Sequence, residues 1–168
     1  MGKHLGGLIT HCGTVWGCRG RSYLYMILTS DHVYIGETGN LPTSRWGSHL
    51  SKADSSFAEK LRIALEQANS PEYDDDFVYI GLYCGVIEEE ETEKRKYARL
   101  AIEEAIHREY VLNGNRFGGL KILLSRPSTR SLRIKLGFDV DSYAKHAIEL
   151  LIKEYIKYKE SAEQAATL

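Results

Sequence analysis

A strand–turn–strand pattern near the start of the chain constrains the fold more than any other feature of the sequence. Tyr23–Thr29 (YLYMILT) is aromatic and aliphatic throughout, which is typical of a β-strand. Ser30-Asp31 supplies turn chemistry, and Val33–Gly36 returns as a second extended run. The two runs therefore predict a β-hairpin.

Helical and extended patterns alternate along the rest of the chain. Gly36–Asn40 breaks the strand pattern, and Pro42 falls where a first helical turn tolerates proline. A later strand is expected to be central in the sheet because its apolar run is continuous. The expected elements are helices over 43–52, 57–68, 90–112 (capped by Asn113-Gly114) and 141–162, the central strand over 77–86, and a short strand within 119–125.

This order predicts an α+β (α/β) fold, with a small central antiparallel sheet flanked by helices and a C-terminal helical extension. The length of 168 residues fits one domain with a single core. We expect an irregular N-terminal arm over 1–21, a core over 22–120, and an extension over 121–168 that ends in a long helix. The apolar spacing of that helix favours packing on the same domain, and a homodimer seam is the alternative.

Composition excludes several functional classes. The formal net charge of −1 excludes a polycation that binds nucleic acid by charge alone. The sequence has no apolar run near the roughly 20 residues of a membrane span, and its start lacks the apolar core of a secretion signal. Three cysteines, an odd number, favour a reducing compartment. We therefore expect a cytoplasmic or nucleoid-associated protein that is not secreted.

The tetrapeptide VYIG occurs twice, at Val33–Gly36 and Val78–Gly81. No period of 20–50 residues recurs, so the copies are not repeat units. In the first copy, Tyr34 shares a sheet face with Tyr25 if the hairpin loop has an even number of residues. An odd loop would separate the two phenols. The second copy follows an acidic run and is interpreted as a core strand.

The stretch after the first copy carries residues suited to phosphate chemistry. Arg45 and His49 are four residues apart, so they share one face of the expected helix. A guanidinium binds phosphate through two parallel hydrogen bonds, and an imidazole can carry a proton near neutral pH. A solvated surface helix is the alternative interpretation.

The run from Tyr23 to His49 resembles the GIY-YIG nuclease family. Tyr23-Leu24-Tyr25 corresponds to its first motif and Tyr34-Ile35-Gly36 to its second, followed by the helix with arginine and histidine. The leading glycine of the first motif is replaced by Tyr23, and Glu37 stands where the excision-repair branch has lysine. The resemblance covers about 22–115 and implies hydrolysis of DNA phosphodiester bonds.

The resemblance also implies one divalent ion, Mg²⁺ or Mn²⁺, held by a glutamate of the long helix. Glu103 fits best, because Ile106 stands three residues later where the family is apolar, and Glu104 is the alternative. An asparagine further on usually closes the site, and Asn115 matches it better than Asn113. The implied catalytic residues are Tyr25, Tyr34, Arg45, His49, Glu103 and Asn115, with either Tyr34 or His49 as general base.

A basic loop follows the expected core and suggests phosphate contacts beside the site. Its residues are Arg126, Arg130, Arg133 and Lys135. A non-catalytic nucleic-acid-binding module is the alternative function, and RNA is an alternative substrate to DNA. Since one ion at one site cuts one strand, a double-strand break would need a homodimer or two visits. The sequence shows no reader domain, so a targeting partner is the other route to specificity.

Overall fold

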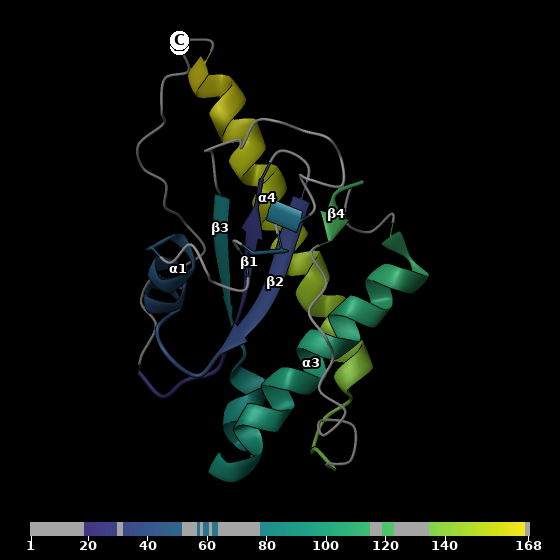
Figure 1. Ribbon diagram of the computed structural model, residues 1–168. Helices are drawn as coiled ribbons and strands as arrows, with labels where there is room; N and C mark the ends of the chain where they lie inside the picture. Colours follow the sequence, from purple (N-terminus) through teal and green to yellow (C-terminus); the bar gives the residue numbers. More distant parts are fainter. Residues whose placement is uncertain are drawn as a thin grey trace.

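The computed structural model describes residues 19–29, 32–51, 57, 59–60, 62–63, 78–114, 119–122 and 135–166 (Figure 1). Its sheet has four strands in the order β3-β1-β2-β4, where β1 is Tyr23–Leu28 and β2 is His32–Thr38. β3 is Val78–Tyr83, and the short β4 is Lys121–Ile122. β1 pairs antiparallel with β2 and β3, whereas β4 runs parallel to β2. The expected α+β class is confirmed, and β4 makes the sheet mixed rather than purely antiparallel.

The predicted hairpin is present, and its loop has an even number of residues. The last pair of the β1–β2 ladder is Leu28 with Val33, and an even number of residues, 29–32, separates the two. The backbone N–H of Thr29 donates to the carbonyl oxygen of His32 at 2.9 Å, and the Thr29 hydroxyl oxygen accepts from the His32 N–H at 3.0 Å. This register places Tyr25 opposite Gly36 and therefore on the same face as Tyr34.

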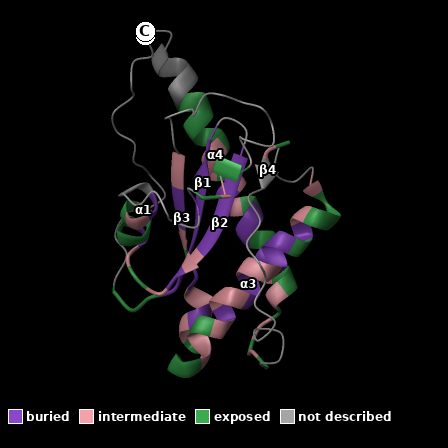
Figure 2. Ribbon diagram, viewed as in Figure 1, coloured by how far each residue is buried: buried purple, intermediate pink, exposed green. Residues whose placement is uncertain are grey.

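The expectation that the strand over 77–86 is central was wrong. β1 occupies the central position, because it alone pairs with both β2 and β3. Every residue of β1 is buried, as Figure 2 shows for this strand. β3 ends at Tyr83, whose side chain is exposed, and residues 85–89 form a 3₁₀ helix, η2 (Gly85–Glu89). A continuous apolar run describes a strand covered on both faces, but it does not say how many strands pair with it.

Each face of the sheet packs against different helices. One face presents Leu24, Met26 and Leu28 to a core built with α3 (Thr92–Leu112) and α4 (Val140–Ala166). The opposite face presents Tyr25 and Ile27 to a smaller aromatic cluster with α1 (Pro42–Ser51). Figure 1 shows α1 at the left of the sheet and α4 passing behind it. The expected helices over 43–52, 90–112 and 141–162 are present, and no end differs by more than four residues. Of the expected helix over 57–68, the described residues 57, 59–60 and 62–63 are helical.

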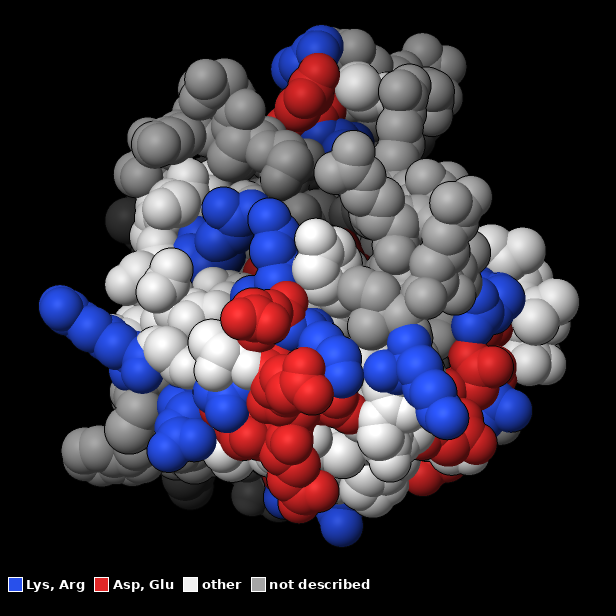
Figure 3. Space-filling model, turned by 90° about the horizontal axis from the view of Figure 1, so that it is seen from below, with Lys and Arg blue, Asp and Glu red and all other residues white. Residues whose placement is uncertain are grey.

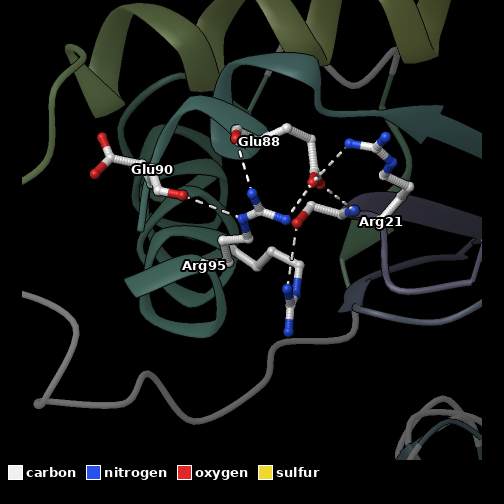
Figure 4. Close-up of polar contacts among 6 residues, drawn as sticks. Arg21, Glu88, Glu90 and Arg95 are labelled. Carbon is white, nitrogen blue, oxygen red and sulfur yellow. Dashed lines mark hydrogen bonds and ion pairs between the residues drawn. The ribbon is translucent and has the colours of Figure 1, made fainter. Parts of the chain in front are cut away.

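A network of hydrogen bonds attaches the start of α3 to β1 and η2 (Figure 4). The Glu88 carboxylate accepts from the backbone N–H of Ser22 at 2.8 Å and from Arg95 at 2.7 Å, and Arg21 lies 3.3 Å away. Arg95 also donates to the backbone carbonyls of Glu88 and Glu90. Because the nearly buried Glu88 carboxylate accepts hydrogen bonds from both Arg95 of α3 and the backbone just before β1, the network fixes how α3 lies against the sheet.

α4 begins at a side-chain cap and packs on the main core. The Asp139 carboxylate accepts from the backbone N–H groups of Asp141 and Ser142 at 3.0 and 3.1 Å, which satisfies donors that the first turn leaves unpaired. Ala144, Ala147, Ile148 and Leu151 are buried in the main core, so these residues of α4 pack against the sheet and α3. Within the described part of the chain, no helix has both the length and the apolar content needed to cross a membrane.

Candidate active site

Two tyrosines of the hairpin lie side by side on the α1 face of the sheet. The ring centroids of Tyr25 and Tyr34 are 6.2 Å apart, in a diagonal cross-strand arrangement. The phenol of Tyr25 lies over Gly36, and a methyl group built on this glycine would overlap the Tyr25 ring and hydroxyl. The glycine of the first VYIG copy thus provides the space in which the Tyr25 hydroxyl reaches across β2.

Helix α1 brings an arginine and a histidine to the Tyr25 hydroxyl. The Nε2 atom of His49 lies 2.7 Å from Tyr25 Oη, and Arg45 Nε donates to the same oxygen at 3.4 Å. α1 starts at Pro42, soon after β2 ends at Thr38, so its first two turns cover the end of the hairpin. The i, i+4 spacing inferred from the sequence therefore places both side chains on one phenol.

Burial determines the protonation states of Tyr25 and His49. Burial, and after it the charge on Tyr34, raises the pKa of Tyr25 well above the ordinary value of a phenol. Burial, and after it the positive charge of Arg45, lowers the pKa of His49 to about 4. At neutral pH, Tyr25 therefore keeps its proton and His49 is uncharged. The Tyr25 hydroxyl can donate to His49 Nε2 while its oxygen accepts from Arg45.

Glu103 of α3 is near enough to the cluster for its charge to act on it. Arg99, one helical turn earlier, forms an ion pair with Glu37 of β2 and lies against Gly39. Glu103 shares that face of α3, whereas the next residue, Glu104, lies about 100° further round the helix. The negative charge of Glu103 acts on Tyr25 and on Lys60. These observations favour Glu103 over Glu104 as the carboxylate of this site.

The side chains that could ligate a metal ion at this site suit an ion that needs few protein ligands. No group of three His, Cys, Asp or Glu side chains converges in the described residues to hold a metal ion. One carboxylate with few other protein ligands suits Mg²⁺, which keeps several waters and can take the remaining oxygens from a substrate. The residues therefore fit the single-ion expectation and do not fit a site enclosed by protein ligands.

Two residues that no sequence motif indicates, Phe57 and Lys60, cover the tyrosines. Phe57 is buried and packs edge-on against Tyr34 and His49, with ring centroids 5.6 and 6.1 Å away. The ammonium nitrogen of Lys60 lies 5.5 Å from the centre of the Tyr34 ring. Only the expected helix over 57–68 could have placed them, since neither belongs to a recognisable motif.

The second VYIG copy pairs with β1 in the same register as the first. Tyr79 and Tyr34 both lie opposite Ile27, one on each side of the central strand. Tyr79 stacks on Tyr25 at 5.8 Å between ring centroids and on Trp46 of α1 at 5.2 Å. The second copy is a packed strand, as predicted, but its tyrosine packs on the site itself.

Several predicted site residues lie outside the described part of the chain. They are Asn115, Arg126, Arg130 and Arg133. Lys135 is described and exposed, and Asn113, the less favoured asparagine, donates from its side-chain amide to Glu109 at 3.0 Å. Figure 3 shows basic and acidic side chains interspersed over the face seen from below. The described part of that face is therefore mixed in charge.

The structure brings four of the six predicted catalytic residues into contact, and the charge of a fifth, Glu103, acts on Tyr25. Tyr25, Tyr34, Arg45, His49 and Glu103 come from β1, β2, α1 and α3. In comparisons with family models, curated proteins and solved structures, no match to this chain was found. What this site can do must therefore be argued from its own chemistry.

Proposed function

We propose that the chain is a metal-dependent endonuclease that hydrolyses phosphodiester bonds of DNA. The observation that carries the proposal is the convergence of Arg45 and His49 on the Tyr25 hydroxyl. On a solvated surface helix, Arg45 and His49 would extend into water. Here the guanidinium and the imidazole both contact one buried phenol. The nearby charge of Glu103 adds the carboxylate that a divalent ion requires.

Arg45 supplies the charge that a phosphate substrate needs. It is exposed, and its hydrogen bond to Tyr25 raises the pKa of its guanidinium, so it stays charged. Its Nε atom is directed to Tyr25, which leaves the terminal nitrogens to bind nonbridging phosphate oxygens. Such preformed hydrogen-bond donors stabilise the negative charge that develops in the transition state.

Proton transfer is assigned to the other side chains of the cluster. Tyr25 keeps its proton, so its hydroxyl orients the attacking water rather than removing a proton as a phenolate. His49 is uncharged at neutral pH and can accept a proton, and Tyr34 is the alternative acceptor. Glu103 would hold one Mg²⁺ or Mn²⁺, which supplies Lewis-acid stabilisation of the phosphate and its leaving oxygen when bound.

Nicking of supercoiled plasmid tests the proposal. We expect nicking in Mg²⁺ or Mn²⁺ that EDTA abolishes and that Glu103→Gln lowers by about a hundredfold or more. Glu104→Gln is the matched control, because it changes the adjacent carboxylate on another face of α3; it should stay within about threefold of wild type. The reverse ranking of the two variants would move the ion to Glu104.

A second set of substrates separates an enzyme from a binding module. Branched DNA and an RNA duplex should be included, since a structure-selective nuclease would leave plasmid intact. If the wild type binds these nucleic acids but cuts none of them with either ion, catalysis is refuted and the module is supported. If it neither binds nor cuts, both functions fail.

A further inference from the structure

The helical residues after α1 cover the tyrosine pair and carry a cation to it. Phe57 is 1% exposed and contacts both Tyr34 and His49, so it fixes this short segment over the site. Lys60 follows three residues later and thus lies on the same side of the helical turn. Its ammonium nitrogen is 5.5 Å from the centre of the Tyr34 ring.

Three charged or titratable groups surround Lys60 on the described elements. The Tyr34 ring of β2 lies beneath its ammonium group, and the charges of Glu103 on α3 and of Glu59 on its own segment act on it. Burial lowers the pKa of Lys60, and the charges of Glu103 and Glu59 oppose that effect. Lys60 is half-buried, so part of its side chain remains accessible.

Accessibility distinguishes the cations of the site from its buried core. Tyr25, Tyr34 and His49 are 1%, 4% and 3% exposed, whereas Arg45 is exposed and Lys60 is half-buried. An incoming phosphodiester would therefore meet the two cations before the phenols. It would also meet the negative charge of Glu103, which repels phosphate unless a neighbouring cation offsets it.

We propose that Lys60 is a further catalytic residue. Its ammonium group would bind a nonbridging oxygen of the scissile phosphate, at a position near both Tyr34 and Glu103. This inference rests on the proposed function. An ammonium group is a compact point charge with three donors, which suits an oxygen approached from one side, whereas Arg45 offers two parallel donors. Arg45 and Lys60 would then hold the phosphate over Tyr25 and Tyr34.

The salt dependence of duplex binding measures this contact without any cleavage. In EDTA, we expect Lys60→Met to reduce the slope of log affinity against log salt by about 0.9, the value for one lost phosphate contact. Lys60→Arg should restore the slope. Lys153→Met is the control, because Lys153 is an exposed residue of α4, and it should keep the wild-type slope.

The nicking rate provides the second measurement. Lys60→Met should nick about ten- to a hundredfold more slowly than wild type at saturating plasmid, with part of the rate recovered in Lys60→Arg. A purely structural role would lower thermal stability and leave the salt slope unchanged. If Lys60→Met does not fold, Lys60→Gln replaces it, since it keeps a polar end at that position.

The outcomes for Lys60 and for the enzyme as a whole are distinguishable. If wild type nicks DNA while a folded Lys60→Met keeps both rate and slope, the role of Lys60 is refuted and the endonuclease stands. If wild type nicks nothing but the slope falls in Lys60→Met, the phosphate contact stands and catalysis fails. An unchanged slope with a slower rate would also refute the phosphate contact.

Discussion

The Tyr25 hydroxyl has its place because Gly36 has no side chain. We expect Gly36→Ala to push the phenol away from His49 and Arg45, since the new methyl group would overlap it. The unfolding free energy should fall by about 1–3 kcal/mol, the usual cost of overpacking, and nicking should fall about tenfold or more. Urea unfolding and plasmid nicking measure the two effects.

Gly47→Ala is the matched control for this prediction. Gly47 lies in α1, is exposed, and has open space where its methyl group would be. The substitution should raise the unfolding free energy by about 0.5–1 kcal/mol, because alanine favours helix over glycine. Equal losses of activity in both variants would show that Gly36 has no special role.

The low pKa of His49 makes the unfolding free energy depend on pH, and its value gives the direction of the change. Its pKa is about 4 in the folded chain and 6.5 ordinarily, so between these values only the unfolded chain binds a proton. The stability that the uncharged His49 side chain contributes is fully present above pH 6.5. It is lost progressively as the pH falls toward 4. Urea unfolding at about pH 7.5 and about pH 5 should show this fall, and His49→Gln should reduce it.

His146 provides the comparison for the pH series. It is exposed on α4, far along the chain from the site, so His146→Gln should retain the wild-type pH dependence. A His49→Gln variant that loses stability on acidification as steeply as wild type would contradict the assignment of this dependence to His49.

At the residue scale, the sequence indicated some of the side chains that meet and left their arrangement open. Alternation along the hairpin left two arrangements of Tyr25 and Tyr34, and only the loop of residues 29–32 decided between them. Nothing in the sequence indicated that Lys60 would lie at the site, because its contact with Tyr34 depends on how its helical segment lies over the sheet. Helix orientation is a tertiary property that local periodicity does not contain.

At the element scale, the aromatic stack between β3 and α1 supports the arginine. Tyr79 stacks on Trp46, the residue next to Arg45, and its hydroxyl finds no hydrogen-bond partner among the described residues. We expect Tyr79→Phe to keep activity and stability, because the ring is retained. Tyr79→Leu should lower the unfolding free energy by about 1–2 kcal/mol and slow nicking.

Near-ultraviolet circular dichroism would follow the stack directly, since it reports on paired aromatic rings. Tyr83→Leu is the control: Tyr83 is on the same strand and face but is 43% exposed and pairs with Tyr23, so nicking should be unaffected. Loss of activity in Tyr79→Phe would assign a role to the hydroxyl instead of the ring.

The position of β1 shows where element-scale prediction stops. The sequences of β1 and β3 are both apolar enough for a buried strand, and composition cannot rank them. β1 becomes central because β2 returns beside it through a short loop and β3 returns later on its other side. The pairing of β3 with β1 joins residues far apart in the sequence, so no local sequence pattern predicts it.

At the scale of the whole molecule, α4 belongs to the same core as α3 and the sheet. Leu151 is 2% exposed in that core, whereas Ile156 on the same helix is 49% exposed. We expect Leu151→Ala to lower the unfolding free energy by about 2–5 kcal/mol and Ile156→Ala by less than about 0.5 kcal/mol. Urea unfolding measures both changes.

The mass in solution tests the homodimer alternative for α4. If α4 completes its own core, both variants should keep the wild-type mass in light scattering. A change in mass with Ile156→Ala would instead show that the exposed side of α4 joins two copies. The apolar spacing of α4 indicated a packed face, while its partners on α3 and β3 depend on tertiary contacts that the spacing does not contain.

The shared register of the two VYIG segments has a consequence for how the chain folds. Both tetrapeptides pair with the same four residues of β1, one on each edge, so the two edges can be filled in either order. The first closes a loop of residues 29–32 and the second must close residues 29–77, which costs more chain entropy. The segment that forms first is then the one carrying Tyr34, and the duplicate fills the remaining edge of β1.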